Sequence, residues 1–231
     1  MKTAAQKTAA LDPSAGDRLP YAGHLDDHTV MTRGGDLIQM IQVDGVAFET
    51  ADSETLNHMA AVRDVVMRGI ANSSLMLYCH VIRRQVTAEL SGAQPDGFVR
   101  DLDDAWQQQL RGKKLYINDM VLMLVRRPAQ GKIGFFDRLT KWGNGTRNSA
   151  ERLADQTREL RELDAARTNL LSALSRYGPR LLGRYHDANG TCSEPLEILS
   201  ALYNGEMQPV LEPTGDAGQY LPYKRISFGL D

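Results

Sequence analysis

The sequence predicts an α+β fold in which helices pack on a mixed, mainly antiparallel sheet. Several short segments alternate apolar and polar residues, or are apolar throughout, which is typical of strands. The longer segments between them repeat apolar residues every three or four positions, which is typical of helices. Only the first two strands are joined by a tight turn. The predicted order of elements is therefore β-β-α-β-α-β-α-β-α.

The first two strands form a predicted β-hairpin at 28–33 and 36–43. The pair Gly34-Gly35 lies between them, and glycine supplies the positive φ angles that a two-residue hairpin turn needs. Both faces of the second strand are largely apolar. We therefore expect this strand to be covered on both sides.

The remaining elements follow from the same two periodicities. Asp52 or Ser53 can cap the first helix. In a later helix, Phe98, Leu102, Trp106 and Leu110 form an apolar stripe at intervals of about four. We predict helices at 52–71, 95–109, 149–177 and 195–203, and strands at 75–84, 115–125 and 181–186.

The chain divides into three predicted regions. Residues 1–18 are small, polar and weakly charged, and we predict a flexible N-terminal arm. Residues 19–204 contain the predicted helices and strands and form one α+β domain. Residues 205–231 are polar and rich in proline, which predicts an extended linker.

Bulk composition excludes several classes of protein. A net charge of -2 argues against a polyelectrolyte binder of DNA or RNA. Cysteine occurs only 2 times, too few for a disulfide framework, so we expect a reducing cytosol. The chain has no apolar run long enough to cross a membrane as a helix, and its N-terminus lacks the apolar core of a signal peptide.

The sequence contains none of the common nucleotide-binding or nucleophile motifs. A phosphate-binding loop requires a glycine, four residues, and then Gly-Lys-Ser/Thr. The pairs Gly112-Lys113 and Gly131-Lys132 lack both the upstream glycine and the hydroxyl residue after the lysine. The sequence contains neither a Gly-x-Ser-x-Gly elbow nor a Gly-x-Gly-x-x-Gly fingerprint. We therefore predict no catalytic residue and no cofactor-binding residue in this chain.

Metal binding is also not predicted. His24 and His28 are four residues apart but precede a strand rather than lie on a helix. Cys79 and His80 are neighbours in a predicted strand, so their side chains point to opposite faces. We expect Cys79 to lie in the core and the histidines to be exposed or hydrogen-bonded.

A basic and aromatic segment at 126–147 is the first candidate interaction site. Cations beside aromatic rings suit a membrane surface or membrane protein, and they also suit stacking and phosphate contacts with nucleic acid. A third interpretation is a surface loop whose aromatic residues pack on the domain's own core. The candidate contact residues are Lys132, Phe135, Phe136, Arg138, Lys141 and Trp142.

Two arginine pairs are the second candidate site. Arg83-Arg84 end the predicted strand 75–84, and Arg126-Arg127 follow the predicted strand 115–125. If these strands end side by side, the four side chains form one basic patch, which a nucleic-acid-binding module would use. The alternative is that paired arginines simply mark where strands leave the core.

Several segments, in this order and spacing, resemble one family: the large cytoplasmic ATPases of VirB-type type IV secretion systems, also called the CagE/TrbE/VirB family. The resemblance covers nearly all of residues 19–231. The segments that carry it are Pro20-Tyr21 with His24, Arg33-Gly34-Gly35-Asp36, Val43-Asp44-Gly45 with Phe48-Glu49-Thr50-Ala51-Asp52, His80-Val81-Ile82-Arg83-Arg84, Pro195-Leu196-Glu197, Leu202-Tyr203-Asn204-Gly205 and Ile226-Ser227-Phe228-Gly229.

The resemblance implies a role in bacterial type IV secretion. Full-length members are hexamer-forming ATP hydrolases that use ATP and Mg²⁺ and power substrate transfer and pilus assembly, including conjugation. Their catalytic residues belong to a C-terminal domain, so we expect 205–231 to lead to an ATPase domain that is absent from this sequence.

The same resemblance implies a docking role for 19–204. The N-terminal domain of family members contacts the membrane surface and inner-membrane subunits, notably a small subunit that is fused to the ATPase in some systems. The expected location is the bacterial cytoplasm, peripheral at the cytoplasmic face of the inner membrane. Other secretion subunits and further copies of the ATPase are the expected partners, and nucleic acid is not.

Overall fold

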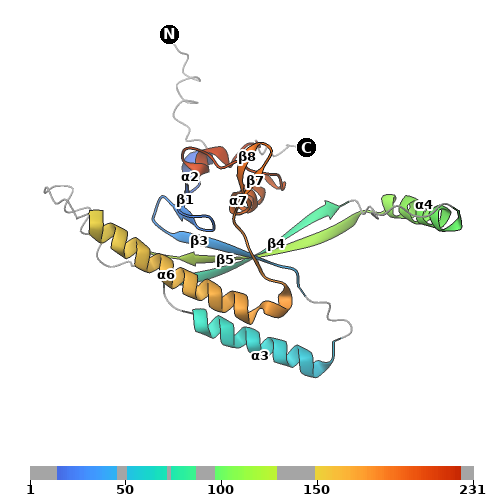
Figure 1. Cartoon of the computed structure of the whole chain (residues 1–231), viewed down its shortest axis with the longest axis horizontal. Helices are drawn as coiled ribbons and strands as arrows, with labels where there is room; N and C mark the ends of the chain where they lie inside the picture. Colours follow the sequence, from blue (N-terminus) through green and yellow to red (C-terminus); the bar gives the residue numbers. More distant parts are fainter. Residues whose placement is uncertain (1–14, 46–50, 72–73, 87–96, 129–148, 225–231) are drawn as a thin grey trace, which may run out of the picture.

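The structure, a computed structural model, describes residues 15–45, 51–71, 74–86, 97–128 and 149–224. It has the predicted α+β architecture, with a sheet between two layers of other elements (Figure 1). All strand pairs within the described ranges are antiparallel. The predicted fold class is therefore confirmed.

The main sheet contains six strands in the described part of the chain. Five follow the order β1-β2-β3-β5-β4, and β6 pairs with the second half of β3. A separate hairpin is formed by β7 and β8. The strands are β1 Tyr21–His24, β2 Val30–Thr32, β3 Leu37–Val43, β4 Leu75–Val86, β5 Leu115–Arg126, β6 Arg180–Leu181, β7 Arg184–Asp187 and β8 Gly190–Ser193.

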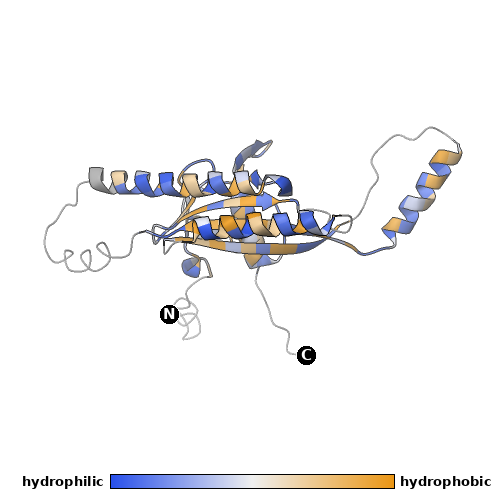
Figure 2. Ribbon diagram, turned by 90° about the horizontal axis from the view of Figure 1, so that it is seen from below, coloured by the Kyte–Doolittle hydropathy of each residue, from blue (hydrophilic) through white to orange (hydrophobic). Residues whose placement is uncertain are grey.

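Helices lie on both faces of this sheet. Long helices α3 and α6 lie side by side on one face, while α7, α8 and the β7–β8 hairpin lie on the other (Figures 1 and 2). The helices are α2 Ala15–Arg18, α3 Ser53–Ile70, α4 Phe98–Arg111, α6 Ser149–Ala173, α7 Glu194–Asn204 and α8 Ala217–Tyr220, with a 3₁₀ turn η1 at Ser175–Tyr177.

The predicted hairpin is formed by β2 and β3, but its connection is longer than two residues. The amide of Gly35 donates to the carbonyl of Thr32 at 3.0 Å, and the Thr32 amide donates to the Asp36 carbonyl at 2.9 Å. Of the two glycines, only Gly35 has a positive φ, +88°. One glycine in the left-handed region is therefore enough for this turn.

Strand β3 is covered on both faces, as its composition predicts. Ile38 and Met40 contact the cluster that contains α7 and α8. Leu37 and Ile41, on the other face, contact residues of α6. Strand β5 extends this arrangement because its residues 121–126 are all buried beside β3. The core therefore lies above and below these two strands.

Two polar contacts hold α6 on the sheet. The side-chain amide of Gln39, which is buried, donates to Asp164 Oδ1 at 2.8 Å and to the hydroxyl of Thr29 at 2.9 Å. Arg126, also buried, donates to Glu162 Oε2 at 2.7 Å. Buried polar groups are costly unless they are paired, so these contacts fix the position of α6 along the strands.

The end of α6 depends on a glycine. The predicted helix 149–177 is α6 followed by η1, and Gly178 then takes the left-handed conformation at φ +58°. A Cβ atom on Gly178 would lie 2.5 Å from Asp44 Oδ2. Both its conformation and the proximity of Asp44 therefore favour glycine at this position.

The segment predicted as a linker is partly folded onto the domain. Ala217 and Leu221 are buried, and the Leu221 carbonyl accepts hydrogen bonds from the side chains of Ser200 and Asn204. Residues 205–224 are thus part of the fold. Their few apolar anchors are separated by prolines and polar residues and show no period. Residues 225–231 lie outside the described ranges.

The predicted N-terminal arm is corrected in the same way for 15–18. These residues form α2, which contacts α8 and is held by Arg33. The Arg33 guanidinium also forms two bonds with the Asp216 carboxylate, at 2.6 and 2.9 Å. A pair of this geometry joins the two ends of the described chain beside the hairpin. Residues 1–14 are not among the described residues.

The buried Gln39 contact gives a stability prediction. We expect Asp164→Ala to lower the free energy of unfolding by about 1–3 kcal/mol, because one amide hydrogen of Gln39 then remains buried without its acceptor. Urea unfolding followed by circular dichroism measures this change. Asp155→Ala, at an exposed position of the same helix, is the control. Equal losses for the two variants would contradict the proposed role of the contact.

Candidate interaction surfaces

The two predicted arginine pairs do not form one basic patch. Strands β4 and β5 are neighbours, but they are antiparallel, so Arg84 lies opposite Ile117 whereas Arg126 lies opposite Leu75. The two pairs are roughly 30 Å apart at opposite ends of the ribbon. Arginines at the C-terminal ends of two adjacent strands lie close together only when the strands are parallel. This register corrects the single-patch prediction.

Most of these arginines also have partners. Arg84 donates to Asp119 Oδ2 at 2.5 Å, and the guanidinium of Arg83 lies 4.6 Å from the centre of the Tyr116 ring. Arg126 is 5% exposed and paired with Glu162. The backbone amide of Arg127 continues the β4–β5 ladder by donating to Ser74. The pairs therefore contribute to the structure of the ribbon and its root.

The other predicted contact residues belong to the segment 126–147, which is described only up to 128. The six predicted contact residues lie outside the described residues, and their contact role stays a prediction. These residues are Lys132, Phe135, Phe136, Arg138, Lys141 and Trp142.

The outer half of the β4–β5 ribbon, together with α4, extends away from the body of the molecule (Figure 1). We call residues 78–86 and 97–119 the arm. Its strands carry exposed apolar side chains on both faces, whereas the root of β5 is buried. An isolated two-stranded ribbon has little stability of its own, so the arm depends on the buried strands at its root.

The outer edge of β4 is open over the described residues. Within those ranges β4 pairs only with β5. Because Arg127 donates to Ser74 across the ladder, the alternation of an antiparallel pair directs the amides of Cys79, Val81 and Arg83 toward the open edge. Such an edge is a template for another strand. Cys79, predicted to be a core residue, is exposed here.

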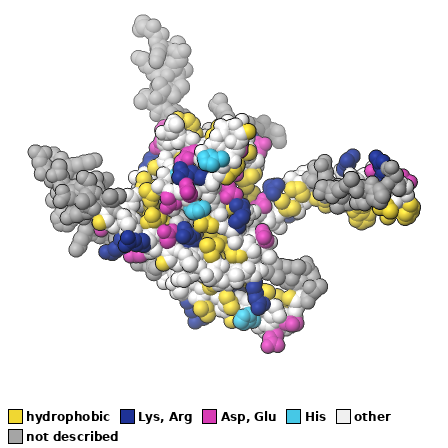
Figure 3. Space-filling view, viewed as in Figure 1, with side chains coloured by type: hydrophobic (Ala, Val, Ile, Leu, Met, Phe, Trp, Pro, Cys, Tyr) yellow, Lys and Arg dark blue, Asp and Glu magenta, His cyan; other side chains and the backbone are white. Residues whose placement is uncertain are grey.

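Helix α4 presents an apolar stripe to solvent. Phe98, Leu102 and Trp106 are 79%, 58% and 54% exposed. Hydrophobic side chains gather along this part of the arm (Figure 3), and hydrophobic and hydrophilic residues alternate along the ribbon of α4 (Figure 2). The spacing was predicted from the sequence. No residue of α4 is buried, so this helix does not pack its stripe on the sheet as α3, α6 and α7 pack theirs.

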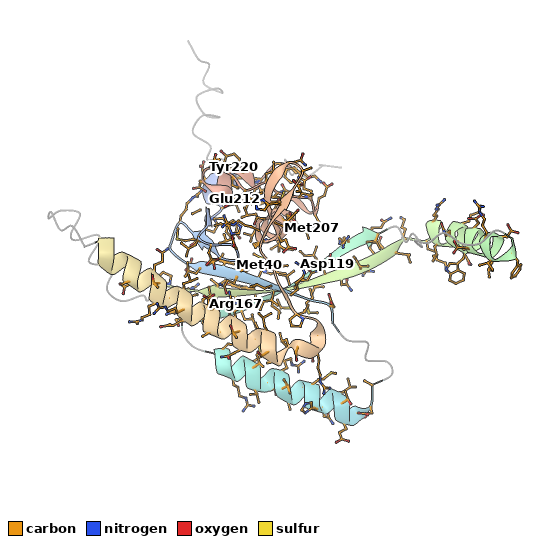
Figure 4. The ribbon with its side chains drawn as sticks, viewed as in Figure 1. Met40, Asp119, Arg167, Met207, Glu212 and Tyr220 are labelled. Atoms are coloured by element: carbon orange, nitrogen blue, oxygen red, sulfur yellow. The ribbon has the colours of Figure 1, made fainter. Side chains whose placement is uncertain are left out.

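A charged cleft of about 160 Å³ lies where the arm meets the body. Asp119 and Met207 mark its two sides in Figure 4. Arg180 donates to Glu194 at 2.6 Å and to Gln42 at 2.6 Å. Since Arg180 and Arg84 both face carboxylates, the cleft does not suit a nucleotide phosphate, which needs unpaired donors.

In the ranges that the structure describes, no group of three or more histidine, cysteine, aspartate or glutamate residues is placed to hold a metal ion. The same ranges contain no helix that is long and apolar enough to span a membrane.

Comparison with known proteins identifies a family that matches part of the chain. Residues 28–133, which include β2 through β5 with the arm, match the family described as "Type IV secretion system ATPase VirB4/TrbE, N-terminal domain". Residues 28–133 of the chain therefore belong to the VirB4/TrbE N-terminal domain family.

Curated relatives of this VirB4/TrbE domain cover more of the chain. Type IV secretion system protein virB4 of Bartonella henselae is 29% identical over 217 residues, which are 92% of this chain and 27% of the relative. The virB4 protein of Brucella suis is 29% identical over 210 residues, 88% of this chain and 25% of the relative. PtlC of Bordetella pertussis is 29% identical over 220 residues, 92% of this chain and 26% of the relative.

The chain therefore spans about a quarter of the length of the curated relatives it matches. The alignment with these relatives covers most of the chain and so extends well beyond residue 133, where the family match ends. It therefore includes much of the C-terminal part of the fold, which contains α6, α7 and the β7–β8 hairpin. The secretion ATPase family predicted from the sequence is confirmed.

A histidine joins the hairpin region of this domain to α7. His24 Nε2 is hydrogen-bonded to the hydroxyl of Ser193 at 2.6 Å, and Nδ1 to the Asp26 carbonyl at 3.0 Å. The Ser193 hydroxyl in turn accepts from the Leu196 amide and caps α7. Burial lowers the pKa of His24. The nearby charge of Arg184 also lowers this pKa, whereas the charges of Glu212 and Asp26 raise it.

The lowered pKa of His24 predicts a pH effect. The unfolded chain binds a proton near pH 6.5, before the folded one does, so stability falls as pH drops through about 6.5. We expect the urea midpoint to fall between pH 7.5 and 5.5, and to fall less in His24→Gln. His80, whose pKa burial also lowers, remains in both proteins. An unchanged pH dependence in the variant would contradict this account.

Proposed function

We propose that this chain is the docking and assembly domain of a type IV secretion ATPase, which it recruits to inner-membrane subunits of the secretion system. The observation that carries the proposal is the open edge of β4 on a ribbon that extends from the body. The family assignment supports the secretion context. The long, exposed edge supports a partner that binds by its backbone.

Binding in this proposal is strand addition. A partner segment in extended conformation pairs with the amides and carbonyls of β4 and so widens the sheet. Main-chain hydrogen bonds supply affinity, and the side chains that flank the edge supply selectivity. Val81, which is 57% exposed, and Tyr78 lie on opposite faces of the strand, so an added strand meets one apolar contact on each face.

The aromatic and basic segment supplies a second contact in this proposal. Lys132, Arg138 and Lys141 meet anionic headgroups, while the rings of Phe135, Phe136 and Trp142 enter the interface. The protein is then peripheral at the cytoplasmic face of the inner membrane. Its location follows from contacts at the surface rather than from a spanning helix.

In this proposal, ATP hydrolysis takes place in another part of the full-length protein. The relatives are about four times as long as the aligned segment. The proposed full-length protein hydrolyses ATP with Mg²⁺ in a domain outside this sequence. The paired arginines of the charged cleft agree with a site outside this domain, because they do not suit nucleotide phosphates.

Nucleic-acid binding is the weaker alternative. It required the two arginine pairs to form one surface, and the ladder register separates them. Arg126 is buried against Glu162, so it does not face a phosphate backbone. A docking domain therefore accounts better for the arm than a nucleic-acid-binding module does.

The edge of β4 can be tested without changing its ladder with β5. We expect Val81→Pro to reduce capture of the small inner-membrane subunit from the same operon roughly tenfold, because the residue loses an edge-facing amide. The readout is co-purification in mild detergent after co-expression. Val81→Ala keeps the amide and is the control.

The control separates two explanations. If Val81→Ala and Val81→Pro weaken capture equally while both melt like the wild type, the side chain rather than the backbone is the contact, and strand addition is wrong. If both variants capture as much of the inner-membrane subunit as the wild type does, docking does not use this edge.

The aromatic segment is tested separately. We expect Phe135→Ser, Phe136→Ser and Trp142→Ser, combined, to weaken association with anionic vesicles and with the inner-membrane subunit while thermal melting stays cooperative. Vesicle flotation and circular dichroism measure the two properties. Loss of cooperative melting would show that these residues belong to the core, and it would contradict a contact role.

A further inference from the structure

Helix α4 lies at the tip of the arm, away from the rest of the molecule in both ribbon views (Figures 1 and 2). It is 14 residues long and has no buried residue. Its N-terminus at Gly97 has no side-chain cap. An isolated helix of this length is marginal in water, and most helices gain their stability from packing of an apolar face. Within the described residues, α4 therefore has an apolar face that packs on no other element.

The apolar face of α4 is broad enough for a second helix. Phe98, Leu102, Trp106 and Leu110 follow one another at intervals of four, and Val99 lies beside them on the helical surface. Large side chains in such a stripe interlock with those of a similar helix. A contiguous apolar surface of this kind marks a protein or membrane contact.

The charges of this segment are separated along the helix. Three acids lie in its first half, at Asp101, Asp103 and Asp104, where Arg100 is the single base. Arg111, Lys113 and Lys114 lie at its other end. Acids near the start and bases near the end also suit the helix dipole.

The charges on one α4 helix are complementary to those on a second, antiparallel copy of it. When two α4 helices lie antiparallel, the acidic half of each is directed toward the basic end of the other, and the two helix dipoles oppose one another. A parallel pair would place acids beside acids. An anionic membrane surface would repel the three aspartates that flank the stripe. The charges thus favour a second copy over a lipid surface.

We propose that two copies of this chain associate through their α4 helices, packed antiparallel along the stripe of Phe98, Leu102 and Trp106. The contact is isologous, so a two-fold axis passes between the helices near their midpoint. Because the arm holds α4 away from the body, the two bodies remain apart. This self-association goes beyond the docking function and uses a different surface from the β4 edge.

The interface is small. Phe98, Leu102 and Trp106, each more than half exposed, bury on the order of 400 Å² per copy, half of the roughly 800 Å² per partner in a standard interface. We therefore expect weak, concentration-dependent dimers of the isolated chain. Contacts elsewhere in an assembly would raise the effective concentration of one arm near another and stabilise the pair.

Sedimentation equilibrium of residues 1–231 tests the proposal. We expect a monomer–dimer equilibrium that weakens as salt is raised, because opposite charges attract across the antiparallel pair. Leu102→Glu combined with Trp106→Glu raises the dimer dissociation constant at least tenfold. Val65→Glu, at an apolar position of α3 that is 70% exposed, leaves it unchanged and is the control for added charge.

A charge exchange tests the pairing itself. One variant replaces Asp101, Asp103 and Asp104 by lysine, and the other replaces Arg111, Lys113 and Lys114 by glutamate. Each variant alone becomes more monomeric, because the two ends of α4 then carry net charge of the same sign. Mixing the two restores dimers.

Three results would overturn the proposal. The first is a wild-type chain that stays monomeric at all concentrations. The second is dimerisation that Val65→Glu abolishes and the α4 variants do not. The third is binding of monomeric chain to phosphatidylserine vesicles that is lost with Leu102→Glu and Trp106→Glu, which would assign the stripe to lipid. Circular dichroism of each variant confirms that a lost dimer is not a lost fold.

Discussion

Burial of β3 on both faces is the constraint on which the other elements depend. A strand with Ile38 and Met40 on one face and Leu37 and Ile41 on the other requires two separate covers. Helix α6 supplies one from more than a hundred residues away. The segment from α7 to Leu221 supplies the other, which explains why residues beyond 204 fold back onto the domain instead of leaving it. The two ends of the described chain then meet at Arg33 and Asp216.

The β4–β5 ribbon divides into two parts with different roles because this cover ends partway along it. Beside β3, the side chains of β5 enter the core, and Arg126 is paired with α6. Beyond Met120, Ile82 still packs against the core, but the described residues of the ribbon also carry exposed apolar side chains on both faces. The same two strands thus anchor the arm at one end and present an open edge and a helix at the other. A binding surface on a rigid root is held in a defined direction.

Local features of the sequence predicted most of the elements, since their causes are local. The Asp52 cap, the apolar run before Arg126 and the period of α6 each depend on neighbouring residues. Features set by tertiary contacts were not predicted. The stripe of α4 has the same period whether it is packed or exposed, so spacing alone does not show that Trp106 faces solvent. The antiparallel register separates Arg84 from Arg126, and no local pattern specifies that register.

The two proposed contacts of the arm are compatible because they use different chemistry in different places. Strand addition at Val81 consumes backbone groups along the edge, whereas α4 uses side chains beyond the end of the ribbon. An added strand widens the ribbon to three strands, which are more stable than two. A stiffer arm loses less conformational freedom when its tip pairs with another copy, so the second association becomes more favourable. Recruitment by an inner-membrane subunit would in this way promote pairing of the domains that it recruits.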